Sequence, residues 1–157
     1  MVSIEKNGQM EDTIKLSNNA EKVSTPGRKQ VWRITEKDDG KSEGDYVSLW
    51  NEDPRKQDEL YMFHPSYTYI NKTVTDFDAR PILQTIFDQG RLVYQQPELA
   101  DIKARCSQKL ANLWPEYKRD LNPQKYPVDL SQKLWDNKMN LIQEIHAYVK
   151  KIDFDNK

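Results

Sequence analysis

Residues 31–36, VWRITE, and residues 45–50, DYVSLW, alternate apolar and polar side chains. An alternation with a period of two is typical of a strand that buries one face. Asp38-Asp39-Gly40 lies between the two stretches and has the composition of a turn. We therefore expect two strands joined by a turn, and we extend the prediction outward from this pair.

Further short strands are expected on the C-terminal side of this pair. Residues 60–64, LYMFH, form a short apolar run, and residues 67–75, YTYINKTVT, are rich in aromatic and β-branched side chains. Residues 82–94 could open a helix at Pro81. Their β-prone side chains and the Gln89-Gly90 pair favour a hairpin instead.

A hairpin is also predicted at the N-terminal side, where alternation begins at Val2 and Asn7-Gly8 signals a two-residue turn. An irregular second strand follows it, with Met10 and Leu16 among its apolar residues. Residues 17–30 are rich in Ser, Asn, Pro and Gly, which predicts a loop between two units.

The last third of the chain changes to helical periodicity. Between Pro97 and Lys118, apolar residues recur at spacings of three and four, and the same pattern runs from Ser131 to Lys151. Asp129 or Ser131 can cap the second helix. Strands followed by helices indicate the α+β class, with a small antiparallel sheet of short strands and two C-terminal amphipathic helices.

Composition excludes several classes of protein. A net charge of −1 and a pI of about 6.1 argue against a dedicated nucleic-acid binder. No stretch approaches the roughly 20 apolar residues of a membrane span, and the first residues lack the apolar run of a signal peptide. The single cysteine, Cys106, excludes an internal disulfide framework and a cysteine-rich zinc site. We expect a reducing, cytoplasmic environment.

Few residues point to chemistry. His64 follows an apolar run, and a structural role at a strand end is favoured over general-base catalysis. Cys106 falls on the apolar stripe of the first helix, where core packing is favoured over nucleophilic catalysis. Basic and hydroxyl side chains gather around a Pro-Gly turn and could hold a phosphate or form a solvated face. They are Lys15, Ser17, Lys22, Arg28, Lys29 and Arg33.

Residues 14–34, IKLSNNAEKVSTPGRKQVWRI, resemble the end of the catalytic core in the nicotinate phosphoribosyltransferase family. The matching elements are Lys15, Ser17, Lys22, Pro26-Gly27 and Arg33. Three later stretches resemble the same family in the same order. They are FHPSYTYINKTV at 63–74, FDQGRLVY at 87–94 and LNPQKYPVDLSQKLWDNKMNLI at 121–142.

The resemblance implies a part of an enzyme of NAD biosynthesis. Members of the family join nicotinate to phosphoribosyl pyrophosphate, with ATP hydrolysis, and form nicotinate mononucleotide. The parent enzyme would need ATP and Mg²⁺, whereas this chain would hold no cofactor and no metal. The family's catalytic histidine and phosphate-binding loops lie in parts that this chain does not resemble. We therefore expect a structural unit that is inactive alone and has no catalytic residue.

The same resemblance predicts domains and partners. Residues 1–30 would be the last strands and loop of a truncated catalytic core, and residues 31–157 a C-terminal α+β domain. The expected partner is the catalytic core of the same enzyme, within a homodimer, with neither nucleic acid nor membrane bound. Lys15, Ser17 and Lys22 are the candidates for contacts with a substrate or anion. Two alternatives remain: a free-standing α+β module that binds a protein or an anion, and a small enzyme that uses His64.

Overall fold

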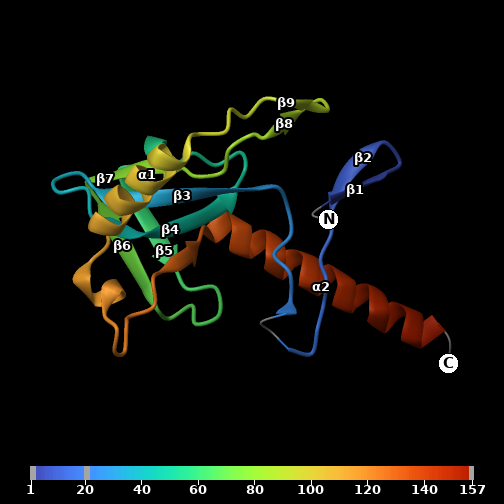
Figure 1. Ribbon diagram of the computed structural model, residues 1–157. Helices are drawn as coiled ribbons and strands as arrows, with labels where there is room; N and C mark the ends of the chain where they lie inside the picture. Colours follow the sequence, from blue (N-terminus) through green and yellow to red (C-terminus); the bar gives the residue numbers. More distant parts are fainter. Residues whose placement is uncertain (1–2, 20–21, 156–157) are drawn as a thin grey trace.

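The computed structural model describes residues 3–19 and 22–155 (Figure 1). The strands are β1 (Ser3–Lys6), β2 (Gln9–Asp12), β3 (Lys29–Glu36), β4 (Ser42–Leu49), β5 (Glu59–Phe63), β6 (Asn71–Thr75), β7 (Phe77–Pro81), β8 (Phe87–Asp88), β9 (Arg91–Leu92) and β10 (Val128–Leu130). The helices are α1 (Leu99–Ala111) and α2 (Gln132–Asp155), with short 3₁₀ turns η2 (Pro54–Lys56) and η3 (Pro115–Lys118). The predicted α+β class is confirmed.

The main sheet has six strands in the order β6-β5-β10-β4-β3-β7. It is larger than the small sheet predicted from the sequence, and it is not purely antiparallel, because β10 runs parallel to β4. The sequence prediction missed β10, which is only three residues long and lies between the two helices. It also missed β7, because Asp76 just before the strand and Asp78 within it have the composition of a turn.

The sheet rolls up on itself. Its two edge strands, β6 and β7, are separated in the chain by Asp76 alone, so the two edges come together at that residue. Trp32 and Ile34 of β3 point into the roll, together with side chains from the other strands. The core cluster inside the roll consists of Trp32, Ile34, Tyr46, Leu60, Met62, Val74 and Phe77.

The outside of the roll carries the alternate residues of the same strands, and the two helices lie there (Figure 1). α2 begins against the outer side of β4 and β10, where Leu134 is fully buried in a second apolar cluster with Phe63 and Leu130. Phe63 and Trp135 complete this contact edge to face, with ring centroids 5.9 Å apart. Beyond its first turns α2 extends away from the sheet.

α1 differs from the helix predicted between Pro97 and Lys118. It ends at Ala111, and none of its residues is buried. Cys106 is exposed, so the prediction that it packs in the core is wrong. The physical reason is that the helix lies across a charged outer face of the sheet and does not reach the apolar interior.

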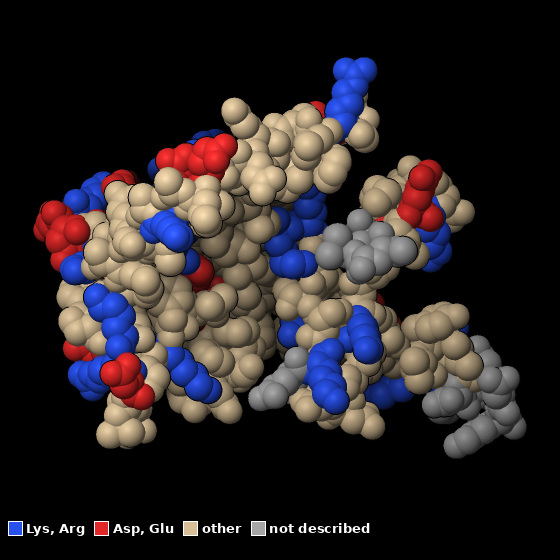
Figure 2. Space-filling view, in the orientation of Figure 1, with Lys and Arg blue, Asp and Glu red and all other residues tan. Residues whose placement is uncertain are grey.

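Both predicted hairpins are confirmed. β1 pairs with β2 around Asn7 and Gly8, and β8 pairs with β9 around Gln89 and Gly90. All four turn residues have positive φ, as two-residue turns of this kind require. Val2, where the first prediction begins, lies outside the described residues. Neither hairpin joins the main sheet among the described strands, and both project from the body in Figure 1 and in the space-filling view of Figure 2.

The start of α2 agrees with the sequence. Ser131 caps it, because the Leu134 amide donates to Ser131 Oγ at 3.1 Å. Asp129, the other predicted cap, belongs to β10. Within the described ranges, neither helix combines the length and the apolar composition needed to cross a bilayer.

Candidate functional site

The loop that carries Lys15, Ser17 and Lys22 is shaped by its own backbone. The Lys15 amide donates to Ser24 Oγ at 2.8 Å, and the Ser24 amide donates to the Lys15 carbonyl at 3.1 Å. Ser17 Oγ accepts from the Asn19 amide at 3.2 Å. The side chains of Lys15 and Lys22 are exposed. In the described part of the chain, no side-chain hydrogen bond or ion pair joins the three residues, so this loop alone does not assemble a site.

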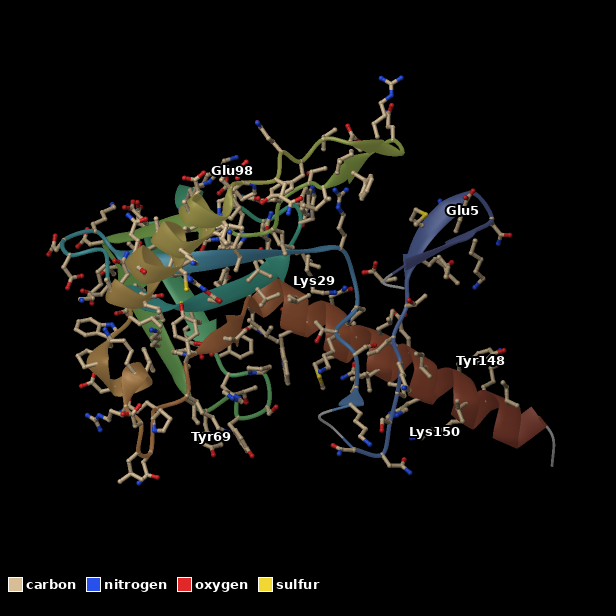
Figure 3. All side chains as sticks on the ribbon, viewed as in Figure 1. Glu5, Lys29, Tyr69, Glu98, Tyr148 and Lys150 are labelled. Atoms are coloured by element: carbon tan, nitrogen blue, oxygen red, sulfur yellow. The ribbon has the colours of Figure 1, made fainter. Side chains whose placement is uncertain are left out.

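The other cations near the Pro-Gly turn serve the fold. Lys29 Nζ donates to the carbonyl oxygens of Thr25 at 2.8 Å and Gly27 at 2.6 Å. Burial lowers the pKa of Lys29, and the nearby Asp12 opposes that shift. The guanidinium of Arg28 stacks on the ring of Trp50, 3.9 Å from its centroid. Figure 3 shows Lys29 where the chain enters β3, above α2.

The imidazole of His64 organises the loop that follows β5. Its Nδ1 accepts hydrogen bonds from the amides of Ser66 and Tyr67, each at 3.1 Å. The ring also lies 5.2 Å from that of Tyr67. This is the structural role at a strand end that the sequence favours.

A cavity of about 520 Å³ opens between α1 and the outer side of β3 and β7. We call it the basic pocket, because four cationic side chains line it: Arg33, Arg80, Arg105 and Lys109. Its polar wall includes Thr35, Ser42 and Asn112, and its apolar wall includes Ile82, Tyr94 and Ile102. Among the described residues, no aspartate or glutamate lines it. Cys106 lies in the same wall.

Arg33 is held rigidly at the base of the pocket. Its Nε and Nη2 donate to the two carboxylate oxygens of Asp45, at 2.9 and 3.1 Å. The Tyr126 hydroxyl donates to the same carboxylate at 3.2 Å and is itself hydrogen-bonded to Ser42. The hydrogen bond to Asp45 raises the pKa of Arg33. The guanidinium therefore stays charged and has a fixed orientation.

The remaining cations are opposed by like charges. Arg80 is the direct cross-strand partner of Arg33 in the β3–β7 ladder. Arg105 and Lys109 are four residues apart on α1, which places them on one face of the helix. Burial lowers the pKa of Lys109, and Arg80 and Arg33 lower it further. Such an arrangement can bind an anion. The described ranges contain no group of three or more His, Cys, Asp or Glu side chains placed to hold a metal ion.

Sequence reasoning found only Arg33 among these four cations. Arg105 and Lys109 are four residues apart, and this spacing predicts that they share one face of a helix. The sequence could therefore have pointed to both residues. Arg80 could not be found, because the sequence does not give the register between β3 and β7.

Similarity to known proteins identifies the family of this chain. The family described as nicotinate phosphoribosyltransferase C-terminal domain matches residues 28–138. The chain belongs to this family. The resemblance drawn from the four sequence stretches is therefore confirmed.

Individual relatives of this C-terminal domain support the same family assignment. A nicotinate phosphoribosyltransferase of Bacillus subtilis is 48% identical over 149 residues, which cover 95% of this chain and 30% of that protein. A human nicotinate phosphoribosyltransferase is 32% identical over 122 residues, covering 77% of this chain and 22% of that protein. A crystal structure of human nicotinic acid phosphoribosyltransferase superposes with a TM-score of 0.65 at 27% identity, covering 78% of this chain and 23% of that one. The chain thus spans less than a third of the length of these relatives.

Proposed function

We propose that this C-terminal domain works as part of a nicotinate phosphoribosyltransferase, which forms nicotinate mononucleotide from nicotinate and phosphoribosyl pyrophosphate for NAD synthesis. The observation that carries the proposal is the 48% identity to the Bacillus subtilis enzyme along 95% of the chain. Coupling to ATP hydrolysis, with Mg²⁺, belongs to the same proposal. So does a cytoplasmic location.

The role of this chain in that enzyme is structural. Its described side chains form a rolled sheet with an internal core, and neither histidine is placed against an acidic partner by a hydrogen bond or ion pair among the described residues. The domain is inactive alone and supports a catalytic core of the same enzyme, within a homodimer. No nucleic acid or membrane takes part.

The boundary with that core lies at residue 30. Two observations support this division into residues 1–30 and 31–157. The family match begins at residue 28, and the first strand of the six-stranded sheet begins at Lys29. Before it, the β1–β2 hairpin pairs only with itself among the described strands. In Figure 3 Glu5 marks this hairpin, which stands away from the body of the sheet.

A complementation assay tests the proposal. The part of the Bacillus subtilis enzyme that this chain does not match is expressed separately and assayed for nicotinate mononucleotide, with and without the 157-residue chain. We expect no product from either part alone and product from the mixture. Turnover by this chain alone would refute its structural role, and full activity of the other part alone would show that the domain is dispensable.

Lys15, Ser17 and Lys22 contact a substrate or anion beside the core in this proposal, since Lys15 and Lys22 have exposed side chains. In the complemented enzyme, Lys15→Ala is expected to raise the KM for the phosphorylated substrate and leave kcat nearly unchanged. Lys150→Ala, an exposed lysine far along α2 in Figure 3, is the matched control. An unchanged KM in Lys15→Ala would remove Lys15 from the contact surface.

A further inference from the structure

We propose that the basic pocket between α1 and the β3–β7 edge is a binding site for a small organic molecule that carries a phosphate or diphosphate group. This inference stands on the described side chains of the chain itself and is independent of the enzyme's activity. None of Lys15, Ser17 and Lys22 lines this pocket.

The positive charge of the pocket favours an anionic ligand. Four cations line it, and among the described residues only Arg33 has a carboxylate partner, Asp45. In the described part of the chain, Arg80, Arg105 and Lys109 make no side-chain hydrogen bond or ion pair. Like charges directly opposite in a sheet destabilise it, as do like charges four apart on a helix. An anion bound between these cations would attract both members of each pair and would offset their mutual repulsion.

The hydrogen-bond donors of the pocket stand on fixed parts of the fold. Arg33 is fixed through its two hydrogen bonds to Asp45, whose carboxylate also accepts a hydrogen bond from Tyr126. The C-terminal end of α1 is fixed as well, because the Ser42 amide donates to the Asn112 carbonyl at 2.9 Å and Lys41 Nζ donates to the Ala111 carbonyl at 3.2 Å. Arginine binds phosphate by planar, paired hydrogen bonds, so fixed guanidinium groups suit that ligand.

The size and the lining of the pocket fit an organic molecule. A volume of about 520 Å³ falls within the range typical of small-molecule sites. Ile82, Tyr94 and Ile102 provide an apolar wall in the same cavity as the cations. A bare inorganic ion would leave that wall without a contact, whereas the organic body of a phosphorylated molecule would cover it. Its concave shape, walled by α1 on one side and by β3 and β7 on the other, favours a small molecule over a polypeptide or a nucleic acid.

The test uses the 157-residue chain with two probes, inorganic pyrophosphate and ADP, by isothermal titration calorimetry. We expect both to bind and ADP to bind more tightly. Arg80→Gln and Arg105→Gln should each weaken binding by about tenfold or more, because each removes charge-assisted hydrogen bonds. Lys103→Gln removes the same charge from α1 outside the pocket lining and should leave the affinity unchanged. Far-UV circular dichroism confirms that the exposed substitutions keep the fold.

Two further readouts locate the bound probe. Cys106 is the only cysteine in the chain and lies in the pocket wall. Pyrophosphate should therefore slow its alkylation by uncharged iodoacetamide in the unmodified chain but not in the Arg80→Gln, Arg105→Gln double variant. Without ligand, Arg80→Gln should raise Tm by about 1–2 °C, because the opposed pair is relieved. Addition of pyrophosphate should raise the Tm of the unmodified chain by more than it raises that of the Arg80→Gln variant.

The outcomes separate the parts of the proposal. Failure of both probes to bind overturns it, as does equal binding by the unmodified chain and the double variant. If pyrophosphate binds and ADP does not, the proposal of an organic ligand is overturned and the pocket is a site for an inorganic anion. Binding that does not protect Cys106 places the probe elsewhere and also overturns the assignment.

Discussion

The two helices lie on the outside of the same rolled sheet, but they have different relations to it. α2 buries Leu134 completely in its first turn, against Phe63 and Leu130. α1 buries none of its residues, although its sequence has the same spacing of apolar side chains. Its largest apolar side chains remain well exposed, with Leu99 at 64% and Leu110 at 51%.

The strands beneath the helices account for this difference. Under α2 the outer face of the sheet presents Val47 and Leu130, which can form a core with the helix. Under α1 it presents Arg33 and Arg80, which cannot. The comparison teaches that an amphipathic pattern predicts a helix, whereas the face of the partner strand determines whether that helix makes a core or a pocket wall.

The largest expected effect is the loss of stability in Leu134→Ala, for which Leu110→Ala on the other helix is the control. Leu134→Ala should lower the free energy of unfolding by about 2–5 kcal/mol, because Leu134 is fully buried and its loss leaves a cavity. Leu110→Ala, the same chemical change at a half-exposed position of α1, should change it by less than about 0.5 kcal/mol. Urea unfolding followed by circular dichroism measures both. Equal losses at the two positions would show that α1 also covers a core.

A smaller effect is expected from the two helix starts. Ser131 Oγ accepts from the Leu134 amide at 3.1 Å and donates to Glu52 Oε2 at 2.7 Å. Ser131→Ala should therefore lower the free energy of unfolding by about 1–2 kcal/mol. Glu98 stands at the corresponding position of α1, labelled in Figure 3, and its side chain makes no capping bond.

Glu98→Ala is the matched control for the cap and should leave the midpoint of urea unfolding nearly unchanged. Chemical denaturation at one pH measures both variants side by side. A loss in Glu98→Ala as large as that in Ser131→Ala would mean that the start of α1 is as firmly anchored as that of α2, and the contrast between the helices would fail.

Local patterns predicted the elements that depend on local physics. Asn7-Gly8 and Gln89-Gly90 both form two-residue turns with positive φ, a conformation that Gly and Asn favour. Ser131 caps the helix that it precedes. The strands around Trp32 and Tyr46 also lie where their alternation placed them.

The features that the sequence could not provide depend on long-range pairing. β10 is only three residues long and exists because it fits between β4 and β5. The rolled shape follows from β6 and β7 joining opposite edges through Asp76, which no local pattern shows. The basic pocket depends on the register that sets Arg80 opposite Arg33, and the exposure of Cys106 follows from the same arrangement. Lys15, Ser17 and Lys22 stay a prediction.

The smallest expected effect concerns a lysine on each helix. Burial lowers the pKa of Lys138 on α2. The pKa of Lys109 on α1 is lowered by burial and also by Arg80 and Arg33. Arg80→Gln should therefore raise the pKa of Lys109 and leave that of Lys138 unchanged. Nuclear magnetic resonance titration of the lysine side chains measures both values in one sample.

The sign of the accompanying pH dependence follows from proton binding. A lysine whose folded pKa lies below its usual value of 10.5 binds fewer protons in the folded chain than in the unfolded chain between those two values. Stability should therefore rise with pH across that window. Arg80→Gln brings the folded pKa of Lys109 closer to its usual value and should therefore reduce the rise of stability with pH. Lys138 should contribute equally to this rise in the unmodified chain and in the variant. If the pKa of Lys109 does not change in Arg80→Gln, the two cations do not face one another. The contrast between a charged sheet face under α1 and an apolar one under α2 would then have no electrostatic support.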